Sequence, residues 1–195
     1  MKISIILPTY NRAKLFLSRA INSIINQSYE NWELIVIDNN SIDNTKELVN
    51  SYQNSKIHFF SIENKGNIAK SRNLGISQAK GDFIAFLDSD DYWKLDKLEK
   101  CINILKSNRS YDGVCHAEFW VNPKNHQKIK KYGPKKYFDY EKLLIRGNSV
   151  SLSAMIVNKK NILEVNSFSE NEDIITAEDY DLWIKLAANN LNIAF

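Results

Sequence analysis

The sequence predicts an α/β fold in which a mostly parallel central sheet is flanked by helices. Short apolar runs bounded by turn-forming residues are typical of strands buried on both faces of such a sheet. The chain has four of them before residue 90, at 3–7, 33–37, 57–62 and 83–87. Segments with helical patterning separate these runs, and the alternation indicates parallel strands joined by helical crossovers.

The remaining elements follow from turn chemistry and apolar spacing. Thr9 or Asn11 is a suitable cap for the first helix, whose inner side is expected to carry Leu15, Ala20, Ile21, Ile24 and Ile25. Further helices are expected at 44–52, 68–79, 95–107, 138–145, 159–165 and 178–189. Beyond the alternation, strands are expected at 113–121 and 149–157, a loop at 168–176 and an apolar run at 192–195.

The composition is that of a globular protein, with 44% hydrophobic and 25% charged residues in a chain of 195. We expect a single domain over residues 1–195. The net charge of +3 is too small to indicate a nucleic-acid partner. No apolar segment approaches the ~20 residues that span a bilayer, and a strand begins at Ile3 with no signal peptide before it, so a cytoplasmic location is expected.

Three carboxylates follow the fourth apolar run within four residues, at Asp88, Asp90 and Asp91. Like charges this close are costly unless a positive group lies among them, and a divalent cation with oxygen ligands is the simplest such group. Ligands of open α/β sheets bind beyond the carboxyl ends of the strands, which is where these acids fall. The alternative is that Ser89, Asp90 and Asp91 only cap a helix whose body begins near Trp93.

Two other predicted strands also end in polar residues. The first ends in Pro8-Thr9-Tyr10-Asn11-Arg12 and the second in Asp38. An aromatic ring, an acid and amide groups on one rim of the sheet suit a nucleotide base, with a cation beside its phosphates. The alternative is that Asp38 and Asn39 are turn formers only. The first turn has no glycine, which excludes a dinucleotide oxidoreductase, and the chain has no Gly-Lys-Ser/Thr phosphate loop.

Five motifs, in order, resemble those of the family 2 glycosyltransferases. They are Ser4-Ile5-Ile6-Leu7-Pro8-Thr9-Tyr10-Asn11-Arg12, Asp38-Asn39-Asn40-Ser41, Asn64-Lys65-Gly66-Asn67 with Ser71-Arg72-Asn73, Asp88-Ser89-Asp90-Asp91, and Ala177-Glu178-Asp179-Tyr180-Asp181-Leu182-Trp183. The resemblance covers essentially the whole chain. It implies a GT-A fold, metal-dependent use of a nucleoside-diphosphate sugar, and inversion at the anomeric carbon. The family usually has an acid followed by glycine where this chain has Asn39-Asn40.

The resemblance also implies site residues. By position, the nucleotide would be bound by Pro8, Thr9, Tyr10, Asn11, Asp38, Asn67, Arg72 and Asp88. Asp88 and Asp90 match the family's Asp-x-Asp pair, which would serve the ribose and hold a manganese or magnesium ion. Residues 1–110 are then the nucleotide-binding half and 111–195 the acceptor-side half.

A glycosyl transfer needs charge stabilisation on the departing diphosphate and a carboxylate that takes the proton of the acceptor hydroxyl. Glu178 and Asp179 are the candidates for this base. Neighbours on a helix point about 100° apart, and Asp179 shares a face with Leu182 and Trp183, so we expect Asp179 to face inward and act as the base. The alternative is a capping box in which Thr176 caps the helix and Asp179 completes the motif.

Residues 120–138 carry six lysines and no acid, with aromatic rings on either side. Such a segment is most often a solvated loop. Two other interpretations are an anionic or saccharide acceptor site, and a peripheral contact with the inner face of the membrane.

The function expected from the resemblance is an inverting glycosyltransferase. It would move a sugar from a UDP-sugar to a saccharide acceptor, free or lipid-linked, in the synthesis of a bacterial surface polysaccharide or lipooligosaccharide. The alternative is a catalytically inactive nucleotide-sugar-binding relative or a C-terminally truncated fragment, since family members commonly continue beyond the position of Phe195. A sugar-phosphate nucleotidyltransferase would need a glycine-rich loop near the N-terminus, which is absent.

Overall fold

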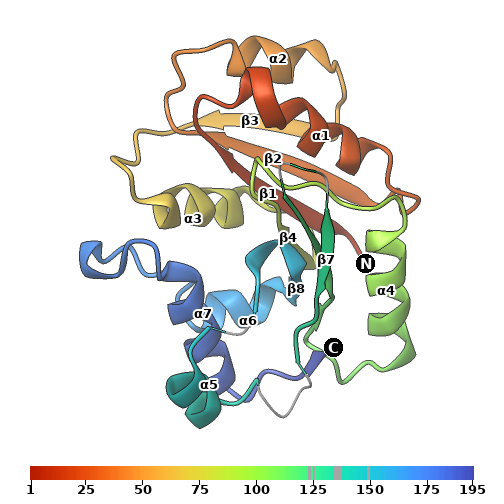
Figure 1. Ribbon diagram of the computed structural model, residues 1–195, viewed down its shortest axis with the longest axis vertical. Coiled ribbons are helices and arrows are strands. Elements are labelled where there is room, and N and C mark those ends of the chain that lie inside the picture. The colour runs from red at the N-terminus through yellow and green to blue at the C-terminus, as the bar shows by residue number, and fades with distance from the viewer. Residues whose placement is uncertain (123, 125, 134–137, 149) are drawn as a thin grey trace.

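The computed structural model describes residues 1–122, 124, 126–133, 138–148 and 150–195. A seven-stranded sheet forms its centre, in the order β3-β2-β1-β4-β8-β5-β9 (Figure 1). The strands are β1 (Ile3–Thr9), β2 (Trp32–Asp38), β3 (Ile57–Ser61), β4 (Phe83–Phe86), β5 (Gly113–Cys115), β8 (Met155–Asn158) and β9 (Ile193–Ala194). Only β8 runs antiparallel to its neighbours in this sheet. The predicted mostly parallel α/β architecture is therefore confirmed.

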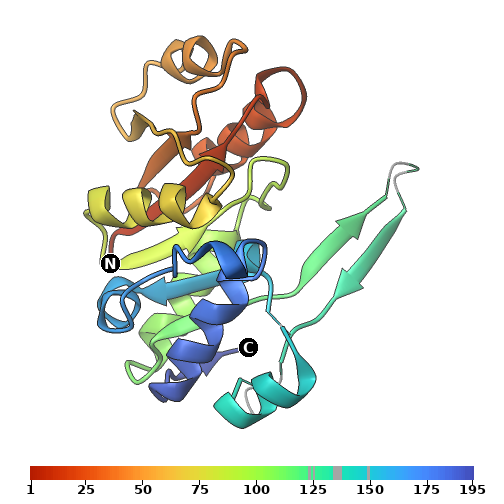
Figure 2. The ribbon, with the colours of Figure 1, turned by 90° about the vertical axis from the view of Figure 1, so that its left-hand side faces the viewer.

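Helices cover both faces of the sheet (Figures 1 and 2). One face packs against η1 (Ala13–Leu17), α1 (Ser18–Ile25), α2 (Thr45–Ser51) and α4 (Lys97–Ser107). The other packs against α3 (Ile68–Gln78), α5 (Tyr140–Arg146), α6 (Lys159–Glu164) and α7 (Glu178–Ala188). Successive β1 residues point to opposite faces, so Ile5 and Leu7 enter the first core and Ile6 enters the second. This two-sided burial explains why the strand sequence is almost uninterruptedly apolar.

A two-stranded hairpin of β6 (Glu118–Val121) and β7 (Gln127–Lys130) stands away from the body of the molecule (Figure 2). Two predictions are corrected here. The strand expected at 113–121 is two strands in different sheets, because the chain leaves the ladder at His116 and Ala117. Part of the lysine-rich segment is a strand and not a loop, and it pairs Ile129 with Phe119 and Lys128 with Trp120. Such cross-strand pairs stabilise antiparallel strands.

The first helix also differs from the prediction. It begins with a π-helical turn, its N-cap position is Arg12, and no side chain caps it. Thr9 is still part of β1, and Asn11 has a left-handed φ of 52°. A π-turn shifts the helical register by one residue, so Leu17 is buried where Leu15 was expected, and Leu15 is exposed.

Three smaller differences concern the second half of the chain. The strand expected at 149–157 is a 3-10 turn, Leu152–Ala154, followed by β8, and residue 149 lies outside the described residues. The loop expected at 168–176 contains a short 3-10 helix, Glu172–Ile174. No helix among the described residues has the length and apolarity to cross a membrane.

Candidate functional site

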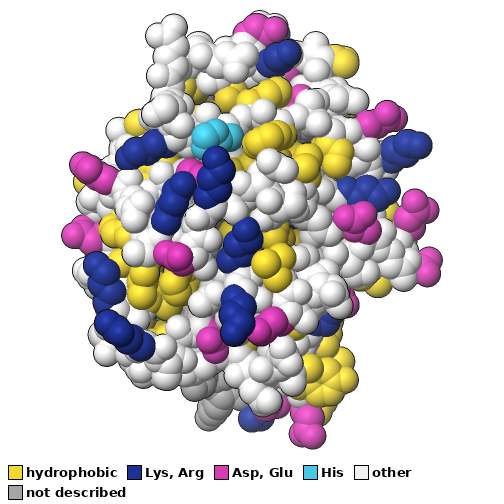
Figure 3. Space-filling model, turned by 180° about the vertical axis from the view of Figure 1, so that it is seen from behind, with side chains coloured by type: hydrophobic (Ala, Val, Ile, Leu, Met, Phe, Trp, Pro, Cys, Tyr) yellow, Lys and Arg dark blue, Asp and Glu magenta, His cyan; other side chains and the backbone are white. Residues whose placement is uncertain are grey.

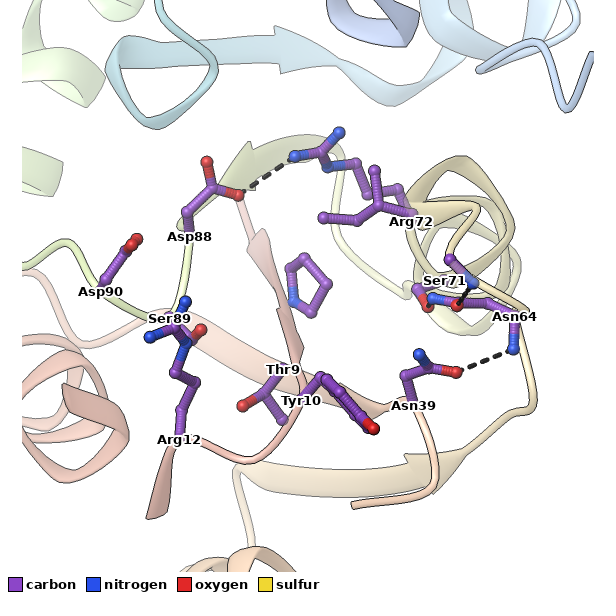
Figure 4. Close-up of a pocket in the computed structure, with 13 residues that line it drawn as sticks. Thr9, Tyr10, Arg12, Asn39, Asn64, Ser71, Arg72, Asp88, Ser89 and Asp90 are labelled. Carbon is purple, nitrogen blue, oxygen red and sulfur yellow. Dashed lines mark hydrogen bonds and ion pairs between the residues drawn. The ribbon is translucent and has the colours of Figure 1, made fainter. Parts of the chain in front are cut away.

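A cleft of about 370 Å³ opens at the carboxyl ends of β1, β2 and β4 (Figure 4). Strand β1 has β2 on one side and β4 on the other, so the order of the strands reverses at β1. Such a reversal is the topological switch point at which open α/β sheets bind ligands. The position agrees with the expectation that the polar strand ends meet at one rim. Predicted residues that line the cleft are Pro8, Thr9, Tyr10, Arg72, Asp88 and Asp90.

Asn11, Asp38 and Asn67 were also predicted to contact a nucleotide, but they do not line the cleft. Asp38 is buried and accepts hydrogen bonds from the backbone N–H (3.0 Å) and the hydroxyl of Ser41. The N–H of Asn11 donates to the same hydroxyl oxygen at 2.8 Å. Asn67 caps α3 by accepting from the N–H of Ala69 at 3.2 Å. These three side chains therefore shape the surrounding loops, and their contact with a ligand stays a prediction.

Several lining residues were not among the predicted contacts. The side-chain oxygen of Asn39 accepts from the N–H of Asn64 at 2.8 Å, and the Asn64 amide donates to the Ser71 hydroxyl at 2.8 Å (Figure 4). This chain of bonds ties the end of β2 to α3. Arg12 lines the opposite side of the opening. Asn39, Asn64, Ser71 and Arg12 all lie within the motifs quoted in the sequence analysis, and these motifs were the signal that could have identified them.

The Thr9 side chain is an unsatisfied polar group at the base of the cleft. Thr9 is 5% exposed, and its hydroxyl has no hydrogen-bond partner among the described residues. Buried hydroxyls are normally paired, so a ligand with a polar edge would gain a contact here. The Tyr10 ring beside it is 54% exposed and free to pack against a planar ligand.

Arg72 joins β4 to the start of α7. Its guanidinium donates to Asp88 at 3.1 Å and to Glu178 at 2.5 Å. The expectation that Asp179 is the inward-facing carboxylate is wrong, because Glu178 is the buried one, at 7% exposure, and Asp179 is half-buried. The physical reason is the ion pair, since α3 presents a buried cation to the first turn of α7.

Asp179 keeps a more open position beside this ion pair. Its oxygens accept from the N–H of Tyr180 at 2.7 Å and from the side chain of Asn148 at 3.1 Å. Partial burial raises the pKa of Asp179, and these two hydrogen bonds only partly offset that effect. The capping-box alternative is wrong, because the N-cap of α7 is Ala177 with no side-chain cap and Thr176 has a left-handed φ of 76°.

The acidic loop after β4 does not cap a helix. Helix α4 begins at Lys97, after Asp96, so Ser89, Asp90 and Asp91 lie outside its first turn and the capping alternative is wrong. The loop is held in place by Arg19, which donates to the Asp90 carbonyl at 2.8 Å.

The acidic loop carries the three carboxylates for which the sequence predicts a divalent cation. Desolvation of the Asp91 carboxyl group, together with the charges of Asp88, Asp90 and Glu118, raises the pKa of Asp91 to about 6. In the part of the chain that the structure describes, no three His, Cys, Asp or Glu side chains converge on one point. Proteins usually bind Mg²⁺ through one or two carboxylates, and substrate phosphates complete the coordination shell.

The chain resembles known proteins in sequence. Residues 4–164 match the model of the family described as "Glycosyl transferase family 2". An uncharacterized glycosyltransferase of Haemophilus influenzae is 36% identical over 162 residues, which are 82% of this chain and 63% of that protein. WfgD of Escherichia coli, named a UDP-Glc:alpha-D-GlcNAc-diphosphoundecaprenol beta-1,3-glucosyltransferase, is 36% identical over 189 residues, 96% of this chain and 70% of WfgD.

A solved structure supports the same relationship. The crystal structure of S. aureus TarS 1-349 in complex with UDP superposes with a TM-score of 0.77 and 25% identity, over 97% of this chain and 56% of that one. The chain thus spans between 56% and 70% of the length of these three proteins. The family match covers most of its residues. This chain belongs to glycosyl transferase family 2 and has the GT-A fold.

Proposed function

We propose that this chain is the catalytic part of an inverting glycosyltransferase that uses a UDP-sugar. The observation that carries the proposal is the cleft at the switch point of the sheet. It gathers an exposed tyrosine ring, two arginines, two aspartates and a threonine hydroxyl that has no hydrogen-bond partner among the described residues. The WfgD name gives UDP-Glc as a donor, and the TarS structure contains UDP. In this proposal residues 1–110 bind the nucleotide and 111–195 form the acceptor side.

The nucleotide would lie across β1 and β2. The Tyr10 ring packs against the base, and Thr9 supplies a hydroxyl to its polar edge. Asp38 and Asn11 contribute to nucleotide binding indirectly, by fixing the turn after β2. Asn67 contributes indirectly by capping α3. Arg72 places a positive charge next to Asp88, where the phosphates would reach. Fixed cations of this kind stabilise the charge that develops on a leaving diphosphate.

Asp88 and Asp90 would hold a manganese or magnesium ion. When bound, such an ion neutralises phosphate charge as a Lewis acid. The protein's own side chains would carry out the proton transfer. Asp179 accepts the proton of the attacking acceptor hydroxyl, and its raised pKa brings its basicity closer to that task. Glu178 is engaged by Arg72, so we assign it the role of fixing the arginine.

The first test is nucleotide binding by titration calorimetry with manganese and with a chelator. Manganese should tighten UDP binding to the wild type, and Asp90→Ala should bind UDP equally with either addition. Equal affinities for the wild type in both conditions would refute the metal site.

The second test separates an enzyme from an inactive relative. Asp179→Asn should bind UDP normally and lose roughly 10²–10⁴-fold in turnover, as expected for a missing general base. Glu178→Gln should lose stability more than Asp179→Asn does, since it breaks a buried pair. UDP binding by the wild type without any transfer or hydrolysis of UDP-sugars would favour the inactive relative.

The proposal extends to a saccharide acceptor of a bacterial surface polysaccharide, and the name of WfgD gives a lipid-linked example. It also includes a cytoplasmic location with peripheral membrane contact through the hairpin. Trp120 is 57% exposed there and lies on the same face of the hairpin as Lys128 and Lys130. An aromatic ring beside two lysines suits an anionic bilayer surface. On the face seen from behind in Figure 3, basic and acidic side chains are interspersed. Residues 134–137 of the predicted segment lie outside the described residues.

Membrane contact is testable with vesicles. Wild type should sediment with phosphatidylglycerol vesicles and not with phosphatidylcholine vesicles, and Lys128→Glu/Lys130→Glu should abolish sedimentation without changing UDP affinity. Lys46→Glu/Lys80→Glu, which makes the same charge change outside the hairpin, is the control. Equal sedimentation of both double variants would refute a contact through the hairpin.

A further inference from the structure

A larger groove of about 1320 Å³ lies between α4, β5 and the β6–β7 hairpin, and we call it the α4 groove. Asp90 lines both this groove and the cleft, so the two are neighbours. The other cleft residues, from β1, β2 and α3, do not line it. The groove therefore offers space that the nucleotide site does not use.

Two buried nitrogen atoms in the α4 groove have no hydrogen-bond partner among the described residues. The first is Nζ of Lys97, a residue 7% exposed, which lies 3.4 Å from the centre of the Trp93 ring. The second is Nε2 of His116, whose Nδ1 is bonded to the carbonyl of Ala117 at 2.9 Å. Burial of such groups without partners is costly, and natural chains pair most of them.

The two nitrogens have complementary roles. Burial lowers the pKa of Lys97 to about 8, so the ammonium is still charged and donating at neutral pH. Burial and the nearby Lys97 lower the pKa of His116 to about 4, so the imidazole is neutral. With Nδ1 donating to Ala117, Nε2 is an acceptor. The groove thus presents one strong donor and one acceptor.

The walls add carboxylates and aromatic faces. Glu118 is oriented by the hydroxyls of Tyr132, at 2.5 Å, and Ser151, at 2.8 Å. The rings of Tyr92, Phe119 and Trp120 are between 43% and 57% exposed. Aromatic faces suit a ligand that is apolar on one side and polar on the other.

The charges that line the groove balance. Four basic side chains (Arg19, Lys94, Lys97 and Lys100) face four acidic ones (Asp90, Asp91, Asp96 and Glu118). A free phosphate or a polyanion would meet as many like charges as opposite ones. A neutral ligand with many hydroxyl groups can donate to the carboxylates and the imidazole and accept from the ammonium. This chemistry is that of a saccharide.

We propose that the α4 groove binds the saccharide acceptor, with Lys97 and His116 hydrogen-bonded to its hydroxyl groups. This inference rests on the proposed function, because it names where the second substrate of that reaction lies. Three residues, Asn148, Ser151 and Ser153, connect the groove to the reacting end. The Ser151 hydroxyl donates to Glu118, the Asp88 N–H donates to Ser153 at 3.3 Å, and the Asn148 amide donates to Asp179. An acceptor lying in the groove would therefore have its terminal sugar directed toward the acidic loop and the base.

The test uses a property of Lys97 that a structural lysine would not have. Methionine has a similar length and no charge, so the substitution removes the cost of burying a charge without a hydrogen-bond partner. Lys97→Met should therefore keep or raise the melting temperature and keep the UDP affinity. Its KM for the acceptor should rise by roughly 10–100-fold, the size expected for a lost hydrogen bond to a charged group. Lys106→Met is the control, because Lys106 is an exposed lysine of the same helix and does not line the groove.

Direct binding is measured by saturation-transfer NMR with alkyl glycosides of glucose, galactose and N-acetylglucosamine, and with an N-acetylglucosamine diphosphate bearing a short alkyl chain. The alkyl diphosphate without sugar separates lipid or phosphate binding from saccharide binding. Signals at the sugar protons that weaken in Lys97→Met and Trp120→Ala support the proposal. It is overturned if no sugar proton receives saturation, or if Lys97→Met binds like the wild type. The groove would then belong to another occupant, such as a polypeptide strand on the free edge of β6. Failure of UDP binding would instead refute the proposed function.

Discussion

The ion pair between Arg72 and Glu178 offers the sharpest test of how the site is built. We predict that Arg72→Met is strongly destabilising. Both side chains of this pair are less than 10% exposed, and their atoms are 2.5 Å apart. Loss of one partner leaves the other as a buried, uncompensated charge, which costs about 3–5 kcal/mol. The second pair, with Asp88, adds little, because the Asp88 side chain is 38% exposed and solvent-screened pairs contribute about 0–1 kcal/mol.

The expected loss for Arg72→Met is therefore dominated by Glu178. For a chain of this size it corresponds to a fall in melting temperature of roughly 6–20 °C. Glu178→Gln should cost less, because Arg72 keeps Asp88 as a partner. The double variant Arg72→Met/Glu178→Gln should be more stable than Arg72→Met alone, since it no longer buries an unpaired carboxylate.

Urea unfolding of the four proteins measures this cycle, and residues in direct contact should show a coupling energy of about 0.5–3 kcal/mol. Additive losses would mean that the pair is not coupled and that the site is held together in another way. The same double variant tests function separately. If Arg72 also serves the phosphates, the variant should remain folded and still bind UDP more weakly than Glu178→Gln does.

Three further predictions follow from single sites. Protonated Asp179 cannot act as a base and its pKa is raised, so the turnover of the wild type should fall on the acid side at a pH above the ordinary aspartate value of 3.8, and the residual turnover of Asp179→Asn should lack this limb. Gly81→Ala should destabilise the protein by about 1–3 kcal/mol in thermal unfolding, because its Cβ would lie 2.7 Å from the Lys2 carbonyl and the Ser4 N–H. The pKa of Lys97 is about 8 in the folded state, against an ordinary value of 10.5. The buried charge therefore lowers stability below pH 8, and this cost is relieved as the pH rises from 8 toward 10.5. The free energy of unfolding should rise over this range more in the wild type than in Lys97→Met.

The parts of the fold that local patterns specify were predictable. The strands before residue 90 are apolar runs with polar ends, and their burial on both faces makes the signal strong. The segment 113–121 was not predictable in the same way, because its division into two strands depends on pairing with β8 and β9, which come about 40 and 80 residues later. The hairpin did leave a local signal in the alternation of Lys128, Ile129 and Lys130, which the high lysine content obscured.

The candidate site also has a part that was predictable from the sequence and a part that was not. The polar strand ends near Thr9 and Asp88 could be predicted, since parallel strands bring such ends to one rim. The orientation of Glu178 could not, because its partner Arg72 lies 106 residues earlier, and a helical projection that considers only apolar neighbours places Glu178 outside. The bond from Asn64 to Asn39 likewise depends on how two loops meet and not on either motif alone.

The distribution of unsatisfied polar groups connects the cleft and the α4 groove. Among the described residues, seven buried side-chain atoms have no hydrogen-bond partner, and four of these belong to residues that line one of the two sites. They are in Thr9 and Arg72 at the cleft and in Lys97 and His116 at the groove. Burying such groups lowers stability, so their concentration at two adjoining openings is best explained by ligands that pair with them. Because Asp90 lines both openings, Asp90→Ala should weaken the binding of both substrates, whereas Lys97→Met should weaken the acceptor alone.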